Sequence, residues 1–137
     1  MNLRRRDFIL VAGAATLAAI APGYSLPTGE QKMYGLIGKM TAAAGQRDAL
    51  IAILLEGTGA MPGCLSYIIA KDPSDANAIW ITEVWDSQES HKASLSLASV
   101  KQSIARGKPL IAGFEKSTAT EPVGGYGLPQ STQAKSR

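Results

Sequence analysis

The chain has 137 residues, of which 45% are apolar, 18% charged and 6% aromatic, and its net charge is +3. This size predicts one small domain. The single cysteine and single histidine exclude an internal disulfide and a metal site built from several thiolates or imidazoles. The mild basic excess gives no support for nucleic-acid binding, so we expect no nucleic-acid partner.

The first 30 residues have the layout of an export signal. Three arginines at positions 4–6 precede an apolar stretch over residues 8–21, which is shorter than the roughly 20 residues that a membrane-spanning helix needs. Arg-Arg-x-Phe-Ile over residues 5–9 resembles the twin-arginine signal, with Arg4 in place of the usual Ser or Thr. We therefore expect a periplasmic or secreted protein that contacts the export machinery transiently and matures between residues 22 and 31. An uncleaved amphipathic anchor is the alternative.

The mature chain begins with a predicted strand and helix. The apolar run over residues 33–40 is typical of a strand. A helix over residues 46–57 follows, because the apolar residues then recur at helical spacing, at Leu50, Ile53, Leu54 and Gly57. We interpret the charges of this helix, Arg47 and Asp48 among them, as a solvated face.

Two further strands are expected to form an antiparallel hairpin. Apolar residues alternate over residues 65–70, and β-branched and aromatic residues fill residues 79–85. The turn-forming residues 71–75 that begin the short connection favour direct pairing of these strands.

The last predicted elements are a long helix and a strand. Asp86 or Ser87 can cap a helix over residues 87–106, with Ser99 as the candidate position of a kink and an apolar stripe at Ala93, Leu97, Val100 and Ile104. Residues 110–116 are predicted as the fourth strand. The Gly-, Pro-, Ser- and Gln-rich residues 121–137 are predicted to be disordered.

The order β-α-β-β-α-β predicts an α+β, ferredoxin-like domain with an antiparallel sheet. We place the export signal and linker at residues 1–30, the domain at residues 31–119 and the tail at residues 120–137. No repeat or heptad pattern competes with this organisation.

The predicted sheet has two apolar faces but only one layer of helices. Along the third strand Ile79 and Ile81 point to one face, and Trp80 and Val84 point to the other. A domain of about 90 residues also buries little surface by itself. We therefore expect a homodimer in which two bare sheet faces stack into a dimeric α/β-barrel assembly.

Residues 62–67 (PGCLSY) and 80–87 (WITEVWDS), with the helix that follows, resemble the antibiotic biosynthesis monooxygenase superfamily, most closely its quinol monooxygenase branch. The resemblance covers about residues 32–118. It implies a dimer of ferredoxin-like subunits with a cavity between each sheet and its helices or partner. It also implies oxidation of phenolic or quinol rings by O2 without metal, flavin or haem, so we expect no cofactor. An electron-rich phenolate can pass an electron to O2 directly, and the protein then binds the ring, favours its deprotonated form and excludes water.

Haem-degrading branches of the superfamily use an Asn on the first strand. Here Gly35 and Gly38 stand on that strand, and residues 33–40 contain no Asn. Haem degradation is therefore not expected.

His91 and Glu83 are the candidate catalytic residues. Relatives in the resemblance place a histidine where this chain has Ser94, whereas His91 lies three residues earlier, close to one helical turn. His91 is the only side chain whose ordinary pKa is near neutrality, which a base for a phenol requires; the alternative is an exposed helix residue. Glu83 can accept a proton or orient His91. Its alternative is a structural partner of Arg106 or of the second subunit.

Four aromatic residues are candidates for substrate binding. Trp85 and Trp80 can form an aromatic wall, but they project to opposite faces, so at most one lines a given cavity and the other is core. Tyr67 and Tyr34 carry hydroxyls suited to a phenolic oxygen, although buried tyrosines usually bond to backbone. We interpret Cys64 as a small buried hydrophobe.

Two functions fit these residues. The first is a cofactor-independent monooxygenase that oxidises a quinol or related phenolic aromatic with O2. The alternative is a non-catalytic dimeric domain that binds a small hydrophobic ligand, motivated by the displaced histidine.

Overall fold

The computed structural model describes residues 32–115 and 117–130. Within these residues nine elements follow one another: β1 (Tyr34–Ala42), α1 (Arg47–Gly57), β2 (Cys64–Lys71), β3 (Ala78–Trp85), α2 (Gln88–Ser94), α3 (Ala98–Gly107), the short 3-10 helix η1 (Lys108–Leu110), β4 (Ile111–Phe114) and β5 (Thr118–Thr120). The predicted export signal and residues 131–137 of the predicted tail lie outside the described residues. No helix within 32–115 and 117–130 has the length and hydropathy to cross a membrane.

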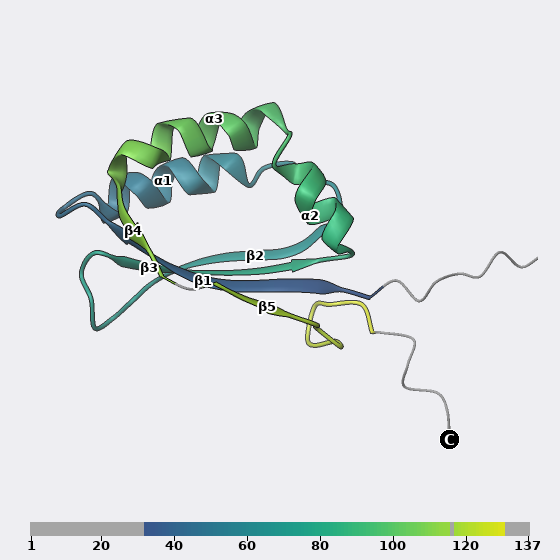
Figure 1. Ribbon diagram of the computed structural model, residues 1–137. Coiled ribbons are helices and arrows are strands. Elements are labelled where there is room, and N and C mark those ends of the chain that lie inside the picture. Colours follow the sequence, from purple (N-terminus) through teal and green to yellow (C-terminus); the bar gives the residue numbers. More distant parts are fainter. Residues whose placement is uncertain (1–31, 116, 131–137) are drawn as a thin grey trace, which may run out of the picture.

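The strands form one antiparallel sheet in the order β2-β3-β1-β4. All three α-helices cover one face of this sheet (Figure 1). This arrangement confirms the predicted α+β class and ferredoxin-like fold. The pairing of β2 with β3 confirms the predicted hairpin.

The sequence prediction missed β5. This strand pairs with residues 35–37 of β1, next to β4, which pairs with residues 40–42. Thr120 stands opposite Gly35 and thus extends the sheet one residue beyond the predicted domain limit of 119. Residues 121–130 follow without helix or strand.

The core lies between the sheet and α1. Leu50 of α1 packs with Ile79 and Ile81 of β3 and with Ala42 of β1, and all four are buried. Leu50 confirms the predicted apolar stripe of the first helix. The predicted solvated face is wrong for Arg47, whose Nη1 donates to the backbone carbonyls of two residues in the β2–β3 connection, at 2.9 and 3.3 Å.

The opposite face of the sheet bears exposed apolar side chains. Ile37 of β1 and Ile68 of β2 flank Thr82 of β3 in register, and Trp80 lies two residues along β3. All of these point away from the helices because side chains alternate along a strand. No described element covers this face (Figure 1).

The predicted helix over residues 87–106 is two helices, α2 and α3. The N–H groups of residues 95–97 each donate to the carbonyl three residues earlier, and Leu97 then adopts an extended conformation with ψ 137°. The Ser94 hydroxyl donates to the His91 carbonyl at 2.7 Å, and such a local bond competes with the helical pattern. The break thus lies at 95–97 and not at Ser99. Of the two predicted caps, Ser87 is the one used, since its Oγ accepts from the Ser90 N–H at 3.1 Å.

Candidate active site

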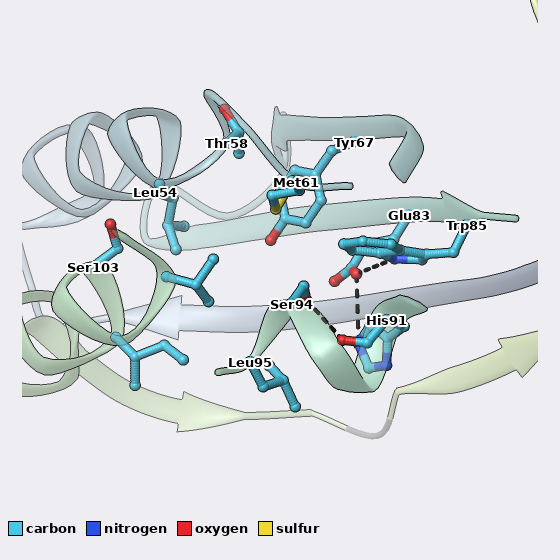
Figure 2. Close-up of a pocket in the computed structure, with 13 residues that line it drawn as sticks. Leu54, Thr58, Met61, Tyr67, Glu83, Trp85, His91, Ser94, Leu95 and Ser103 are labelled. Atoms are coloured by element: carbon cyan, nitrogen blue, oxygen red, sulfur yellow. Dashed lines mark hydrogen bonds and ion pairs between the residues drawn. The ribbon is translucent and has the colours of Figure 1, made fainter. Parts of the chain in front are cut away.

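A cavity of about 120 Å³ lies between the sheet and the three helices. Figure 2 shows Glu83, Trp85 and His91 at one end of this cavity, with Leu54 and Ser103 toward the other. The lining comes from α1 and the loop after it, from β2 and β3, and from α2, α3 and the link between them: Leu54, Gly57, Thr58, Met61, Tyr67, Glu83, Trp85, His91, Ser94, Leu95, Val100, Ser103 and Ile104. Six of these side chains are apolar and six carry a polar group, namely Thr58, Tyr67, Glu83, His91, Ser94 and Ser103.

The polar end is organised around one carboxylate oxygen. The Trp85 indole Nε1 donates to Glu83 Oε2 at 2.8 Å, and His91 Nε2 lies 3.7 Å from the same oxygen. The Glu83 and His91 side chains are only 12% and 18% exposed, which contradicts the interpretation of His91 as an exposed helix residue. A separation of 3.7 Å is too long for a hydrogen bond but short enough for an ion pair.

Two aromatic rings hold the His91 imidazole. Trp85 meets it edge-on with 5.5 Å between ring centroids, and Tyr34 lies at 5.3 Å in a tilted arrangement. Tyr34 and Trp85 are paired residues on β1 and β3, so the sheet register itself sets this clamp. The rings leave Nε2 directed toward the carboxylate.

The burial of the site changes its acid–base properties. Burial raises the pKa of Glu83, although the Trp85 hydrogen bond and the His91 charge oppose this shift. Burial, and then the nearby Glu83 charge, also raise the pKa of Tyr67. Tyr67 is therefore a neutral hydrogen-bond donor, while Glu83 is shifted toward the range in which a carboxyl group can exchange protons near neutral pH.

The structure brings four of the six predicted site residues into the cavity: His91, Glu83, Trp85 and Tyr67. Tyr67 stands opposite Glu83 across the β2–β3 pair, and its hydroxyl points into the cavity (Figure 2). Tyr34 does not line the cavity but contacts His91, which does.

Trp80 lies on the other face of the sheet. Its Nε1 donates to Asp72 Oδ2 at 2.9 Å, and Lys39 Nζ lies 5.4 Å from the centre of its ring. The structure therefore separates the two tryptophans as their odd spacing predicted, with Trp85 at the cavity and Trp80 outside it. The prediction that the second tryptophan is core is wrong, because Trp80 is 40% exposed.

Two predictions about neighbouring residues need correction. Arg106 forms an ion pair with Glu56 and not with Glu83, so the proposed structural partnership with Glu83 is wrong for this arginine. Cys64 is half-buried and not buried, and its Sγ lies 3.6 Å from the Ser66 carbonyl oxygen. Burial raises the pKa of the Cys64 thiol, which disfavours a reactive thiolate.

Sequence reasoning missed several apolar and hydroxyl residues of the cavity. Leu54, Val100 and Ile104 belong to the predicted stripes, so helical spacing indicated their face but not that a cavity lies beneath it. Ser94 is buried and lines the cavity together with His91, although the two belong to successive turns. Position 91, where this chain has its histidine, and position 94, where the resemblance places one, therefore both face the cavity.

Among the described residues, no group of three or more His, Cys, Asp or Glu side chains is placed to hold a metal ion. The cavity instead presents one carboxylate, one imidazole, one phenol, one indole and three aliphatic hydroxyls among apolar side chains. These groups can move a proton and bind a hydroxyl-bearing ring.

The fold and the cavity define a ferredoxin-like α+β protein with an aromatic pocket that carries a His–carboxylate pair. A family model described as antibiotic biosynthesis monooxygenase matches residues 33–106. The chain belongs to this family.

Solved structures agree with this assignment. A proposed antibiotic biosynthesis monooxygenase from Chloroflexus aurantiacus J-10-fl is 68% identical, with a TM-score of 0.69, over 71% of this chain and 99% of that one. A second, from Deinococcus radiodurans, is 29% identical (TM-score 0.57; 67% of this chain, 94% of that one). A third, from Caulobacter crescentus CB15, is 18% identical and shares the fold, with a TM-score of 0.63 over 69% of this chain and 93% of that one. No curated protein matches the chain.

Proposed function

We propose that the protein is a cofactor-independent monooxygenase that oxidises a phenol or quinol with O2. The observation that carries this proposal is the placement of Glu83, His91 and Tyr67 around one end of a cavity whose other lining residues are apolar or carry only a hydroxyl. Its volume of about 120 Å³ is comparable to that of an engineered apolar cavity of roughly 150 Å³ that binds benzene. The size thus supports a substrate with a single ring.

The polar groups suit deprotonation of a ring hydroxyl. A hydroxyl placed between Glu83 and His91 gives up its proton to this pair, and the neutral Tyr67 hydroxyl donates to the oxygen that becomes negative. The Trp85 indole keeps Glu83 Oε2 in place and presents an aromatic wall to the ring.

The reaction balances without an external reductant. The phenolate passes an electron to O2, and the two radicals combine with formation of a carbon–oxygen bond. For a hydroquinone, one oxygen atom stays on the ring, which loses two hydrogen atoms, and the other leaves as water. The apolar lining excludes solvent while this occurs.

Oxygen uptake with a panel of single-ring hydroquinones tests the proposal. His91→Ala should lower kcat/KM by about 100-fold or more, the usual contribution of a positioned base. Glu56→Gln is the control, because Glu56 is an exposed residue outside the cavity. No enzyme-dependent uptake with any ring would contradict the proposal, and uptake unaffected by His91→Ala would remove His91 from the mechanism.

The alternative is a dimeric domain that binds a small hydrophobic ligand without turnover. The observation in its favour is Ser94, which stands at the cavity where the resemblance places a histidine. Tight binding of a ring compound, with no oxygen uptake by any reduced form of it, would favour this function.

We propose further that the protein is an exported homodimer. The exposed Ile37, Ile68 and Trp80 on the outer sheet face support pairing of two copies through that face. The twin-arginine-like order at residues 5–9 supports export. Mass spectrometry of the periplasmic fraction tests export, and an intact Met1 there would contradict a cleaved signal.

A further inference from the structure

The apolar part of the cavity continues to the protein surface. Leu95, in the link between α2 and α3, and Ile104, on α3, both line the cavity, yet their relative exposures are 48% and 51%. Aliphatic side chains that both line a cavity and meet solvent form its rim. We call Leu95 and Ile104 the apolar rim.

The rim differs chemically from the inner end. Of the residues that line the cavity, only Glu83 and His91 can carry a charge near neutral pH, and both stand at the polar end (Figure 2). Val100 lies about one turn before Ile104 on α3 and also lines the cavity, so apolar contacts extend for about 6 Å along this helix. None of the lining residues along this path is charged, so a charged substituent would find no ionic partner there.

The volume limits what the enclosed part can hold. About 120 Å³ accommodates one ring, whereas drug-sized ligands occupy pockets of roughly 300–1,000 Å³. A substrate larger than one ring must therefore extend toward solvent, and Leu95 and Ile104 are the only exposed residues of the lining. Only an apolar group gains free energy there, because it covers side chains that otherwise face water.

We propose that the apolar rim is a subsite for an alkyl chain, so that the substrate is a single phenolic ring with an aliphatic tail. The hydroxyl points to Glu83 and His91, and the tail lies across Leu95 and Ile104. This inference rests on the proposed function for the ring, but the subsite makes its own contribution to binding.

Calorimetric titration with phenol, 4-methylphenol, 4-butylphenol and 4-heptylphenol under nitrogen tests the subsite, because turnover requires O2. The dissociation constant should fall by about twofold to fourfold per methylene, the upper value being that of complete burial. The variant Leu95→Ser/Ile104→Ser should lose most of this dependence on chain length. Ile104→Thr, which keeps a β-branched side chain, should lose part of it. Circular dichroism checks that each variant retains its helices.

Leu55→Ser is the matched control, because Leu55 is a 56% exposed leucine of α1 that does not line the cavity. It should keep the dependence of the wild type. A dependence that persists in the double variant, or is absent from the wild type, overturns the subsite. A change in the mass of the assembly caused by the rim substitutions, without loss of the chain-length dependence, identifies the rim as a protein contact and also overturns it.

Oxygen uptake with the corresponding alkylhydroquinones separates this inference from the proposed function. Uptake with a KM that does not depend on chain length leaves the oxidation intact and overturns the subsite. Chain-dependent binding that the double variant loses, without uptake of any quinol, supports the subsite and overturns the oxidation. Absence of both binding and uptake overturns both.

Discussion

Two carboxylates of this protein show how surroundings decide what a side chain can do. The Ser74 N–H, the Trp80 indole and Lys39 Nζ all bond to Asp72, and they hold the pKa of its carboxyl well below the usual range. Asp72 is thus a permanent anion with a structural role. Glu83 has one indole donor and is buried, and its pKa is raised. A group that can gain and lose a proton is the better candidate for catalysis.

The raised pKa of Glu83 predicts a characteristic pH dependence of stability. The folded protein holds the Glu83 proton more tightly than the unfolded chain, so this contribution to stability is lost as pH rises from about 4.5 through the folded pKa. Glu83→Gln removes that loss and can still accept the Trp85 hydrogen bond. The melting temperature of the variant, relative to wild type, should therefore rise between pH 4 and pH 8.

Thermal melts at pH 4, 6 and 8 measure this difference. Glu56→Gln on the surface is the control and should show no comparable rise. A difference between Glu83→Gln and wild type that is constant over this range would contradict a raised pKa. The groups that face Glu83, namely His91, Tyr67 and Cys64, are present in both proteins.

For single residues, the sequence predicted contacts between side chains close in the chain and missed contacts that depend on how distant segments pack. Glu83 and His91 are separated by one turn and the start of one helix, so their approach was predictable. The bond between Trp80 and Asp72 was not, because it depends on how the β2–β3 connection folds back over the sheet. The clamp of Tyr34 on His91 depends on the register between β1 and β3, which hydrophobic pattern alone does not fix.

At the scale of elements, the short helix α2 brings two successive turns to one cavity. His91 and Ser94 both line it, so an imidazole at either position reaches the same space. We expect His91→Ala/Ser94→His to recover about a tenth of the oxygen uptake that His91→Ala loses. The initial rate with the best hydroquinone measures this recovery. Ser96→His, on an exposed residue outside the cavity, should recover none when combined with His91→Ala. Equal rates for the two double variants would show that position 94 cannot supply a base.

The turn before β2 packs directly against the start of α2. Gly63 has φ +82°, and a Cβ there would lie 2.5 Å from Ser90 Cβ and 2.8 Å from Asp86 Oδ1. Gly63→Ala should therefore lower the free energy of unfolding by about 2–4 kcal/mol, through backbone strain and overpacking together.

Gly45 provides the control for this substitution. It has φ +75° with nothing within 4 Å of an added Cβ, so Gly45→Ala should lose only about 1 kcal/mol, from backbone strain. Urea unfolding of both variants measures the difference. Equal losses would mean that the contact of the turn with α2 contributes nothing.

At the scale of the whole molecule, the exposed apolar side chains on the sheet face opposite the helices predict that two copies pair through that face. Ile37→Asp and Ile68→Asp place charges on this face and should convert a dimer to a monomer. Leu55→Asp changes an exposed residue of α1, on the other side of the sheet, and should leave the dimer intact. Light scattering at micromolar concentration measures the mass of each variant. A monomeric wild type would contradict pairing through this face.

The order of elements was predictable because each strand and helix has its own apolar period. Strand β5 was not predictable, because its three residues, Thr-Ala-Thr, show no such apolar period. They form a strand only through pairing with β1. A kink at Ser99 was predicted, but the full division into α2 and α3 at residues 95–97 was missed, since the apolar stripe runs through both helices and conceals the local bond of Ser94. The candidate site followed from this order only in part, because Leu95 of the unpredicted link between α2 and α3 lines the cavity.

The shortness of α2 has a thermodynamic consequence. Its seven residues are fewer than the roughly 12–15 that an isolated helix needs in water, so α2 keeps its shape through the Ser87 cap and the rings around His91. Local unfolding should therefore begin there and carry His91 away from Glu83. A ligand that fills the cavity binds only the docked form and shifts this equilibrium by mass action. Formation of the acid–base pair and binding of the ring are then linked equilibria, and each favours the other.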